Sequence, residues 1–327
     1  MIYLEEFRFP DIKTENVYIV DNDEMKHASS YFTDNIYPFY FISHKKLHHL
    51  KFSPITILYG GNGSGKSTIL NVISRKLRIS RNSLYNIAPW FDHYVRLCKF
   101  KSNTNFSGEE FDETGKIHSK YDISSITSML TSDDIFKMVM DDRITNDQIF
   151  NKSRILQKQW ILANTSNDKK SSRALEYQKR ICSHLDFENG ENINEYKDYM
   201  NRKNKSFNKY FSEKIGKMKQ EFSNGESSLL KFSELIEKDG LYILDEPENS
   251  LSSEFQLNLS NIILHAARYN NVQFIIATHS PFLLSLEDAK IYDLDSYPVQ
   301  EKKWWELENM KNYFNLFESK RDFFINS

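Results

Sequence analysis

Apolar positions near the start of the chain follow the spacing of strands and then of a helix. Residues 2–9 and 15–20 cluster β-forming residues on either side of a polar turn at 10–11, so we expect two strands there. The apolar run 55–59 predicts a buried strand, and helical spacing follows over 66–78. The first part of the chain therefore predicts a strand–turn–helix unit.

The middle of the chain has a different pattern. From about residue 80 to 222 it is polar, poor in glycine and mostly helical in its spacing. Helices are predicted over 133–144, 147–163 and 172–186, and the longest run, 193–222, forms one apolar stripe.

After this middle segment, strands and helices alternate again. A helix over 229–236 precedes a buried strand at 241–245, and a helix over about 252–268 precedes a second buried strand at 273–278. Continuous apolar strands between helices are typical of a parallel sheet covered on both faces.

The end of the chain predicts a further strand at 290–294. An amphipathic helix follows, and we expect it to pack against the sheet through Trp304, Leu307, Met310, Phe314 and Phe317. The whole pattern predicts an α/β core in two parts, residues 1–80 and 223–327, separated by a mostly helical insertion over 81–222.

Composition adds limits. With 327 residues, 39% hydrophobic and 27% charged, the chain has the composition of an ordinary globular protein. Cys98 and Cys182 lie far apart without metal-binding spacing, which argues against zinc and disulfides. The acidic start argues against a signal peptide, and no apolar run approaches the roughly 18 residues of a membrane span. We expect a cytoplasmic location.

Charge is unevenly distributed. Residues 150–222 contain sixteen basic and nine acidic residues, a net charge of +7, whereas the whole chain carries −2. A basic surface of this kind can bind the phosphates of DNA. A solvated helix face explains the same composition and is the simpler alternative.

One stretch carries clear chemistry. Residues 60–67 fit the pattern G-x-x-x-x-G-K-S between a predicted strand and a predicted helix, which is the setting of a phosphate-binding loop. Its glycines let the amide N–H groups turn toward a polyphosphate. Lys66 is expected at the β- and γ-phosphates and the Ser67 hydroxyl at Mg²⁺. The candidate nucleotide contacts are Gly60, Asn62, Gly63, Ser64, Gly65, Lys66, Ser67 and Thr68.

Other polar residues follow the two buried strands of the C-terminal part. Asp245 and Glu246 end the first strand, so Asp245 could hold Mg²⁺ and Glu246 could act on the attacking water. His279 ends the second strand, at the same edge of the sheet. The Ser/Gly-rich turn Ser223–Ser228 precedes a helix and could attract an anion, although such a turn is more often only a cap.

An aromatic segment precedes the phosphate loop. Residues 30–43 contain six aromatic side chains: Tyr31, Phe32, Tyr37, Phe39, Tyr40 and Phe41. One of them could stack on an adenine ring, but core packing is the commoner use of such a cluster and the interpretation we favour.

Four motifs follow one another along the chain: the phosphate loop, the turn at Ser223–Glu226, the acidic strand end and His279. This order resembles the ATP-binding-cassette (ABC) ATPase superfamily, within it the soluble branch that includes SMC and RecF, and more narrowly a bacterial family of small predicted AAA/ABC-type ATPases. The resemblance covers residues 50–80 and 220–320 well, and the middle of the chain poorly.

The resemblance implies further roles. Ser223 and Gly225 match the signature motif, which contacts the γ-phosphate of ATP held by the opposite subunit, and His279 matches the switch histidine. The run from Asn249 to Ser252 matches the loop that crosses the dimer interface. A γ-phosphate-sensing loop is expected at 131–134, although no glutamine stands there.

The sequence therefore predicts an ABC-type P-loop NTPase core that binds and hydrolyses ATP with Mg²⁺ as an ATP-dependent homodimer. Its catalytic residues are expected to be Glu246, His279 and Lys66, and its metal ligands Ser67 and Asp245. The cycle could be coupled to DNA through residues 150–222 or to an effector protein from the same operon. The alternative is an ATP-gated scaffold or sensor of a bacterial defence or toxin-control complex that does not bind DNA.

Overall fold

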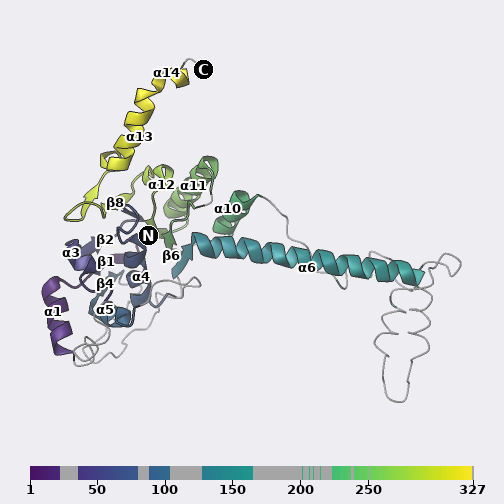
Figure 1. Ribbon diagram of the computed structural model, residues 1–327, viewed down its shortest axis with the longest axis horizontal. Helices are drawn as coiled ribbons and strands as arrows, with labels where there is room; N and C mark the ends of the chain where they lie inside the picture. Colours follow the sequence, from purple (N-terminus) through teal and green to yellow (C-terminus); the bar gives the residue numbers. More distant parts are fainter. Residues whose placement is uncertain are drawn as a thin grey trace. The chain divides into compact units, whose positions relative to one another are not determined.

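The computed structural model describes residues 1–22, 36–79, 88–103, 127–164, 201, 206, 209, 214, 223–236, 239–249 and 251–325, with only the backbone of 162 and 163. The chain divides into one unit of residues 1–137 and 223–327 and a second unit of residues 138–222. Figure 1 labels many of the elements. The helices predicted over 172–186 and 193–222 lie almost wholly outside the described residues. Residues 81–137, which the sequence pattern assigns to the helical insertion, belong to the first unit. The division of the chain into 1–80, 81–222 and 223–327 stays a prediction.

A six-stranded sheet forms the centre of the first unit. Its strand order is β5-β6-β7-β3-β8-β9; the first five strands are parallel, and β9 runs antiparallel to β8. The strands are β5 Thr127–Thr131, β6 Gly240–Asp245, β7 Val272–Ala277, β3 Ile55–Tyr59, β8 Lys290–Asp293 and β9 Gln300–Lys302. The four strands predicted here from apolar runs are confirmed, and so is the α/β fold class.

A smaller antiparallel sheet contains β2 (His49–Lys51), β1 (Leu4–Arg8) and β4 (Lys99–Ser102), in that order. Strand β1 confirms the first N-terminal prediction. The strand predicted at 15–20 is wrong, because these residues belong to helix α1, Ile12–Asp21.

The start of α1 shows why the strand did not form. The Asp11 carboxylate accepts a hydrogen bond from the Thr14 backbone N–H and caps the helix. Helical geometry also brings Glu15 into the protein interior, where it finds hydrogen-bond partners. These contacts outweigh the β-propensity of Val17 to Val20.

Helices cover both faces of the central sheet. Alternate strand residues point to opposite faces, so Leu58 belongs to one hydrophobic core and Ile57 to the other. The first core also contains residues of the small sheet, α4 (Lys66–Lys76) and α5 (Phe91–Leu97). The second contains residues of α10 (Asn224–Leu235), α11 (Ser253–Tyr269) and α12 (Pro281–Leu284).

A buried glutamine joins the two sheets. The Gln273 carbonyl oxygen accepts from the backbone N–H groups of Tyr3 (2.8 Å) and Leu4 (2.9 Å), and its amide donates to the Leu4 carbonyl at 2.9 Å. The polar side chain is therefore satisfied inside an otherwise apolar strand.

Two helical predictions change. The helices predicted over 133–144 and 147–163 form a single helix, α6, from Ser132 to Asn164. None of the helices in the described part of the chain has both the length and the apolar character needed to cross a membrane.

The C-terminal helix does not pack as predicted. After the short helix η3 (Trp304–Glu306), Leu307 is buried and Met310 packs on the second core. Farther along α13 (Glu308–Ser319), Phe314 and Phe317 are 66% and 56% exposed, and α14 (Arg321–Ile325) is exposed throughout. The apolar residues have helical spacing, but only the first turn of α13 packs on the second core.

Candidate active site

The phosphate loop lies between the end of β3 at Tyr59 and the start of α4 at Lys66. Gly63 and Gly65 have φ values of 78° and 99°, a backbone region that favours glycine. A Cβ atom on Gly65 would lie 2.4 Å from Cε1 of Phe41, so the aromatic ring packs directly against the loop. The glycine thus satisfies both the backbone conformation and the close approach of the ring.

Lys66 is the most connected residue of the loop. Its Nζ donates to the carbonyl oxygens of Gly60 (2.8 Å) and Gly61 (3.2 Å) and lies 2.7 Å from His279 Nε2. It is also 3.7 Å from the Glu246 carboxylate. Burial lowers the pKa of the Lys66 ammonium, and the carboxylates of Glu246 and Asp245 oppose this shift.

Ser67 and Asp245 meet at the start of α4. The Ser67 hydroxyl donates to Oδ1 of Asp245 at 3.0 Å, and the aspartate is buried at the end of β6. A hydroxyl and a carboxylate offer the hard oxygen atoms that Mg²⁺ prefers, with phosphate oxygens and water completing its shell. The residues present therefore fit a magnesium ion. No cluster of three metal-ligating side chains occurs in the ranges the structure describes.

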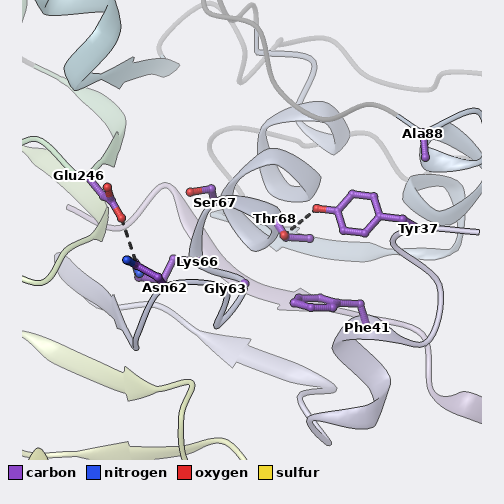
Figure 2. A pocket seen from close by; sticks show the side chains of 10 residues that line it. Tyr37, Phe41, Asn62, Gly63, Lys66, Ser67, Thr68, Ala88 and Glu246 are labelled. Carbon is purple, nitrogen blue, oxygen red and sulfur yellow. Dashed lines mark hydrogen bonds and ion pairs between the residues drawn. The ribbon is translucent and has the colours of Figure 1, made fainter. Parts of the chain in front are cut away.

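Glu246 follows β6 in a left-handed conformation, with φ of 49°. This conformation is uncommon for a non-glycine residue and is often found at functional sites. A hydrogen bond from the Glu246 N–H to the Ala277 carbonyl (2.9 Å) holds it. The carboxylate accepts from the Asn249 amide (3.1 Å) and lies 3.5 Å from His279 Nε2. Figure 2 shows Glu246 facing Lys66, on the side of the loop away from Tyr37 and Phe41.

A buried carboxylate that the sequence interpretation missed positions His279. Oε1 of Glu248 accepts from the Thr278 hydroxyl (2.7 Å), the His279 N–H (2.7 Å) and the Ser280 N–H (3.1 Å). The sequence marks Glu248 only as part of the run after β6. Its partners lie thirty or more residues away, so local spacing could not assign this role.

Asp295 is a second carboxylate that the sequence interpretation missed. It follows β8, and its Oδ2 accepts from the Gly61 N–H at 2.7 Å. The turn after β8 thus fixes the start of the phosphate loop. A chain separation of 234 residues hides this contact from any local pattern.

A cavity of about 630 Å³ extends along the loop. Its lining includes Asn62, Ser67 and Thr68 of the loop and helix, with Tyr37 and Phe41 on the other side (Figure 2). The Tyr37 hydroxyl donates to Thr68 Oγ1 at 2.7 Å.

The aromatic segment before the loop therefore has two uses. Phe39 is buried in the core, as the core-packing interpretation expects, whereas Tyr37 and Phe41 line the cavity. Tyr31 and Phe32 lie outside the described residues.

The structure places the signature residues apart from this cluster. Ser223 caps α10, with its hydroxyl oxygen accepting from the Glu226 N–H at 3.3 Å. Neither Ser223 nor Gly225 occurs among the residues that line the cavity.

At the expected sensing loop, Thr131 Oγ1 donates to the Asp134 carboxylate at 2.7 Å. It also accepts from the Asp134 N–H at 3.1 Å, and this bond caps the start of α6. Thr131 ends β5 opposite Asp245 of β6. The loop thus starts at the edge of the sheet that carries the other site residues.

Comparison with protein families gives a match over residues 191–285. The matching family is described as "AAA domain, putative AbiEii toxin, Type IV TA system". The matched segment contains β6, which ends at Asp245, and the following Glu246. It extends past His279, and the phosphate loop precedes it. The fold around it is α/β, with a mostly parallel sheet flanked by helices and the phosphate loop after β3. The match covers less than a third of this chain, and a comparison with curated proteins gives no match.

Solved structures similar to this chain include ABC and SMC proteins. The Smc head domain of Pyrococcus furiosus with an extended coiled coil, bound to the C-terminal domain of ScpA, is 14% identical, covers 98% of this chain and 100% of its own, and has a TM-score of 0.34. The SMC head domain of Thermotoga maritima is 14% identical over 78% and 92%, with a TM-score of 0.30. A structure described as "An inward-facing conformation of a putative metal-chelate type ABC transporter" is 15% identical, covers 83% of this chain and 80% of its own, and has a TM-score of 0.33. TM-scores this low do not establish a common arrangement of the whole chains.

Proposed function

We propose that this protein binds ATP together with Mg²⁺ and hydrolyses it. The observation that carries the proposal is the convergence of Lys66, the Ser67–Asp245 pair, Glu246 and His279 at one edge of a parallel sheet. Ligands of open α/β sheets bind at this edge.

In the proposed reaction, water attacks the γ-phosphorus and the bond to the bridging oxygen breaks, so that ADP leaves with the bonding electron pair. Glu246 accepts the proton of the water, and His279 holds a γ-phosphate oxygen. Lys66 neutralises charge on the β- and γ-phosphates. Ser67 and Asp245 would hold the magnesium ion, which neutralises phosphate charge when bound.

The base would lie on the far side of the loop. Phe41 is half-buried, lines the cavity and packs on Gly65, so its ring is placed for stacking. An aromatic ring holds a base through its π-face.

ATP binding would join two copies of the chain. Ser223 is exposed at the start of α10, where the free N–H groups of a helix end can meet the γ-phosphate held by the other copy. Such a contact is isologous, so one pairing creates two composite sites.

Two variants test this function together. Glu246→Gln should bind ATP and elute as a dimer, because the water is no longer deprotonated. Ser223→Arg should bind ATP as a monomer without turnover. Asn258→Arg, at an exposed position of α11, controls for the added arginine. Size-exclusion chromatography with ATP and Mg²⁺ distinguishes the outcomes, and equal dimerisation of both site variants would contradict the composite site.

What the cycle drives has two candidates. The net charge of +7 over residues 150–222 favours DNA. ATP-dependent DNA binding should then weaken steeply with salt and disappear on charge reversal of Lys203, Lys205 and Lys209.

The family description, which names a toxin–antitoxin system, favours the second candidate, a scaffold that holds an effector protein. A stoichiometric partner that co-purifies and leaves on hydrolysis would support it over DNA binding.

A further inference from the structure

Glu15 is a buried acid that the proposed reaction does not use. It lies on α1 with 0% of its surface exposed. Its Oε2 accepts from the Tyr40 N–H at 2.9 Å and from the Ser43 hydroxyl at 2.8 Å, whereas Oε1 is buried without a hydrogen-bond partner. Burial raises the pKa of this carboxyl group, and its hydrogen bonds oppose the shift.

Both donors belong to the segment that forms the aromatic wall of the cavity. Tyr40 has a φ of 64°, a left-handed conformation that is unfavourable for a tyrosine. The next residue is Phe41, the first of helix α3 (Phe41–His44), and its ring lies against Gly65. One hydrogen bond thus connects Glu15 to the backbone that sets the direction of the Phe41 ring.

The same segment is held at its other end. The Tyr37 hydroxyl donates to Thr68 of α4 (Figure 2). Helix α1 is itself anchored, because Tyr18 stacks on Phe39 and its hydroxyl lies 3.0 Å from His93 of α5. The wall is therefore fixed to two different helices. Glu15 makes its attachment to α1 through the Tyr40 backbone, whereas Asn16 accepts from the Tyr40 hydroxyl at 2.6 Å.

Core packing alone does not explain an acid at this position. Burying a carboxylate costs free energy that an apolar side chain of similar size would not. Hydrogen bonds that the carboxylate accepts offset this cost. One of them comes from the backbone N–H of Tyr40, and it holds the strained turn beside the cavity.

We propose that Glu15 is a positioning residue for the base of the nucleotide: it holds the Tyr40–Phe41 turn so that the Phe41 ring can stack on the base. This inference rests on the proposed binding of ATP. The proposal gives helix α1 a part in recognising the base. It gives α1 no part in recognising the phosphates.

The test compares ATP with inorganic triphosphate, which has the phosphates but no base. Titration calorimetry should show that Glu15→Ala binds ATP about tenfold more weakly, since stacking of a base on an aromatic ring typically has an effect of this size or larger. Its affinity for inorganic triphosphate should stay within about twofold of wild type, because the phosphate loop is unchanged. The kcat at saturating ATP should also be unchanged.

Three further variants sharpen the result. Glu15→Gln keeps an acceptor oxygen and should bind ATP like wild type. Glu15→Asp keeps the charge but shortens the reach, and it should reproduce the selective loss even if the alanine variant does not fold. In Phe41→Ala, the additional change Glu15→Ala should have little further effect on ATP affinity, because the stacking ring is already gone.

Each remaining outcome is informative. An equal loss of affinity for ATP and inorganic triphosphate, or no loss for either, overturns the role of Glu15. A wild-type protein that binds inorganic triphosphate and ATP equally also overturns it, because no base recognition then exists. Failure of the wild type to bind both ligands contradicts the proposed function itself.

Discussion

Replacement of Glu248 by alanine tests how the histidine turn is held. In the native protein Oε1 of Glu248 accepts from Thr278, His279 and Ser280. The Ser280 N–H also lies 3.0 Å from Thr278 Oγ1, so it keeps a partner in the variant. The Thr278 hydroxyl and the His279 N–H lose their Glu248 acceptor.

The size of the effect follows from these losses. A buried donor without a partner costs about 1–3 kcal/mol, so two donors cost about 2–6 kcal/mol. Water can enter the space left by the side chain, and the variant also loses Oε2, which is buried without a hydrogen bond. Both effects reduce the cost, and we expect the free energy of unfolding to fall by about 2 kcal/mol.

Urea unfolding, followed by circular dichroism, measures this change. Steady-state kinetics of the same variant should show a lower kcat with a smaller change in KM, because His279 is proposed to act on the γ-phosphate. Glu248→Gln keeps the acceptor and should lie within about 1 kcal/mol of wild type. Glu234→Ala, which removes an exposed ion pair with Lys231, should change stability by less than about 0.5 kcal/mol. If Glu248→Ala is as stable as the Glu234 control, the carboxylate does not hold the turn.

Two other predictions concern the cavity walls. Gly65→Ala should weaken ATP binding more than tenfold, roughly the effect of 1.4 kcal/mol, because the new Cβ meets Phe41 at 2.4 Å in a left-handed backbone. Gly63→Ala is the control, because Gly63 also has a positive φ but no atom lies within 4 Å of the new Cβ. This variant carries the backbone strain without the clash. Equal losses of fluorescent-nucleotide affinity in the two variants would contradict the steric argument. The pKa of Glu15 in the folded state lies above the ordinary 4.5, so the folded state binds more protons than the unfolded state. The contribution of Glu15 to the free energy of unfolding is therefore complete below pH 4.5 and is lost as the pH rises through the raised pKa. Glu15→Gln should therefore gain stability relative to wild type as the pH rises above about 4.5 in urea titrations, and parallel pH profiles would refute the shift.

The sequence by itself predicted the elements whose information is local. A glycine-rich pattern between an apolar run and a helical one specifies a phosphate loop, because backbone conformation and spacing act within a few residues. The strands ending at Asp245 and at Ala277 are mostly apolar runs, and parallel pairing brings their ends to one edge. This pattern predicts that Lys66 and Glu246 lie near each other, and the structure has 3.7 Å between the Lys66 ammonium and the Glu246 carboxylate.

Tertiary structure decided the features that depend on distant partners. Val17 to Val20 favour a strand locally, but the interior contacts of Glu15 with Tyr40 and Ser43 favour a helix there. The carboxylates of Glu248 and Asp295 acquire roles only where remote backbone N–H groups meet them.

The C-terminal helix has the spacing of a packed element, yet only its first turn, at Leu307 and Met310, contacts the core. Apolar periodicity reports which side chains share a face. What that face contacts depends on where the rest of the chain directs the helix.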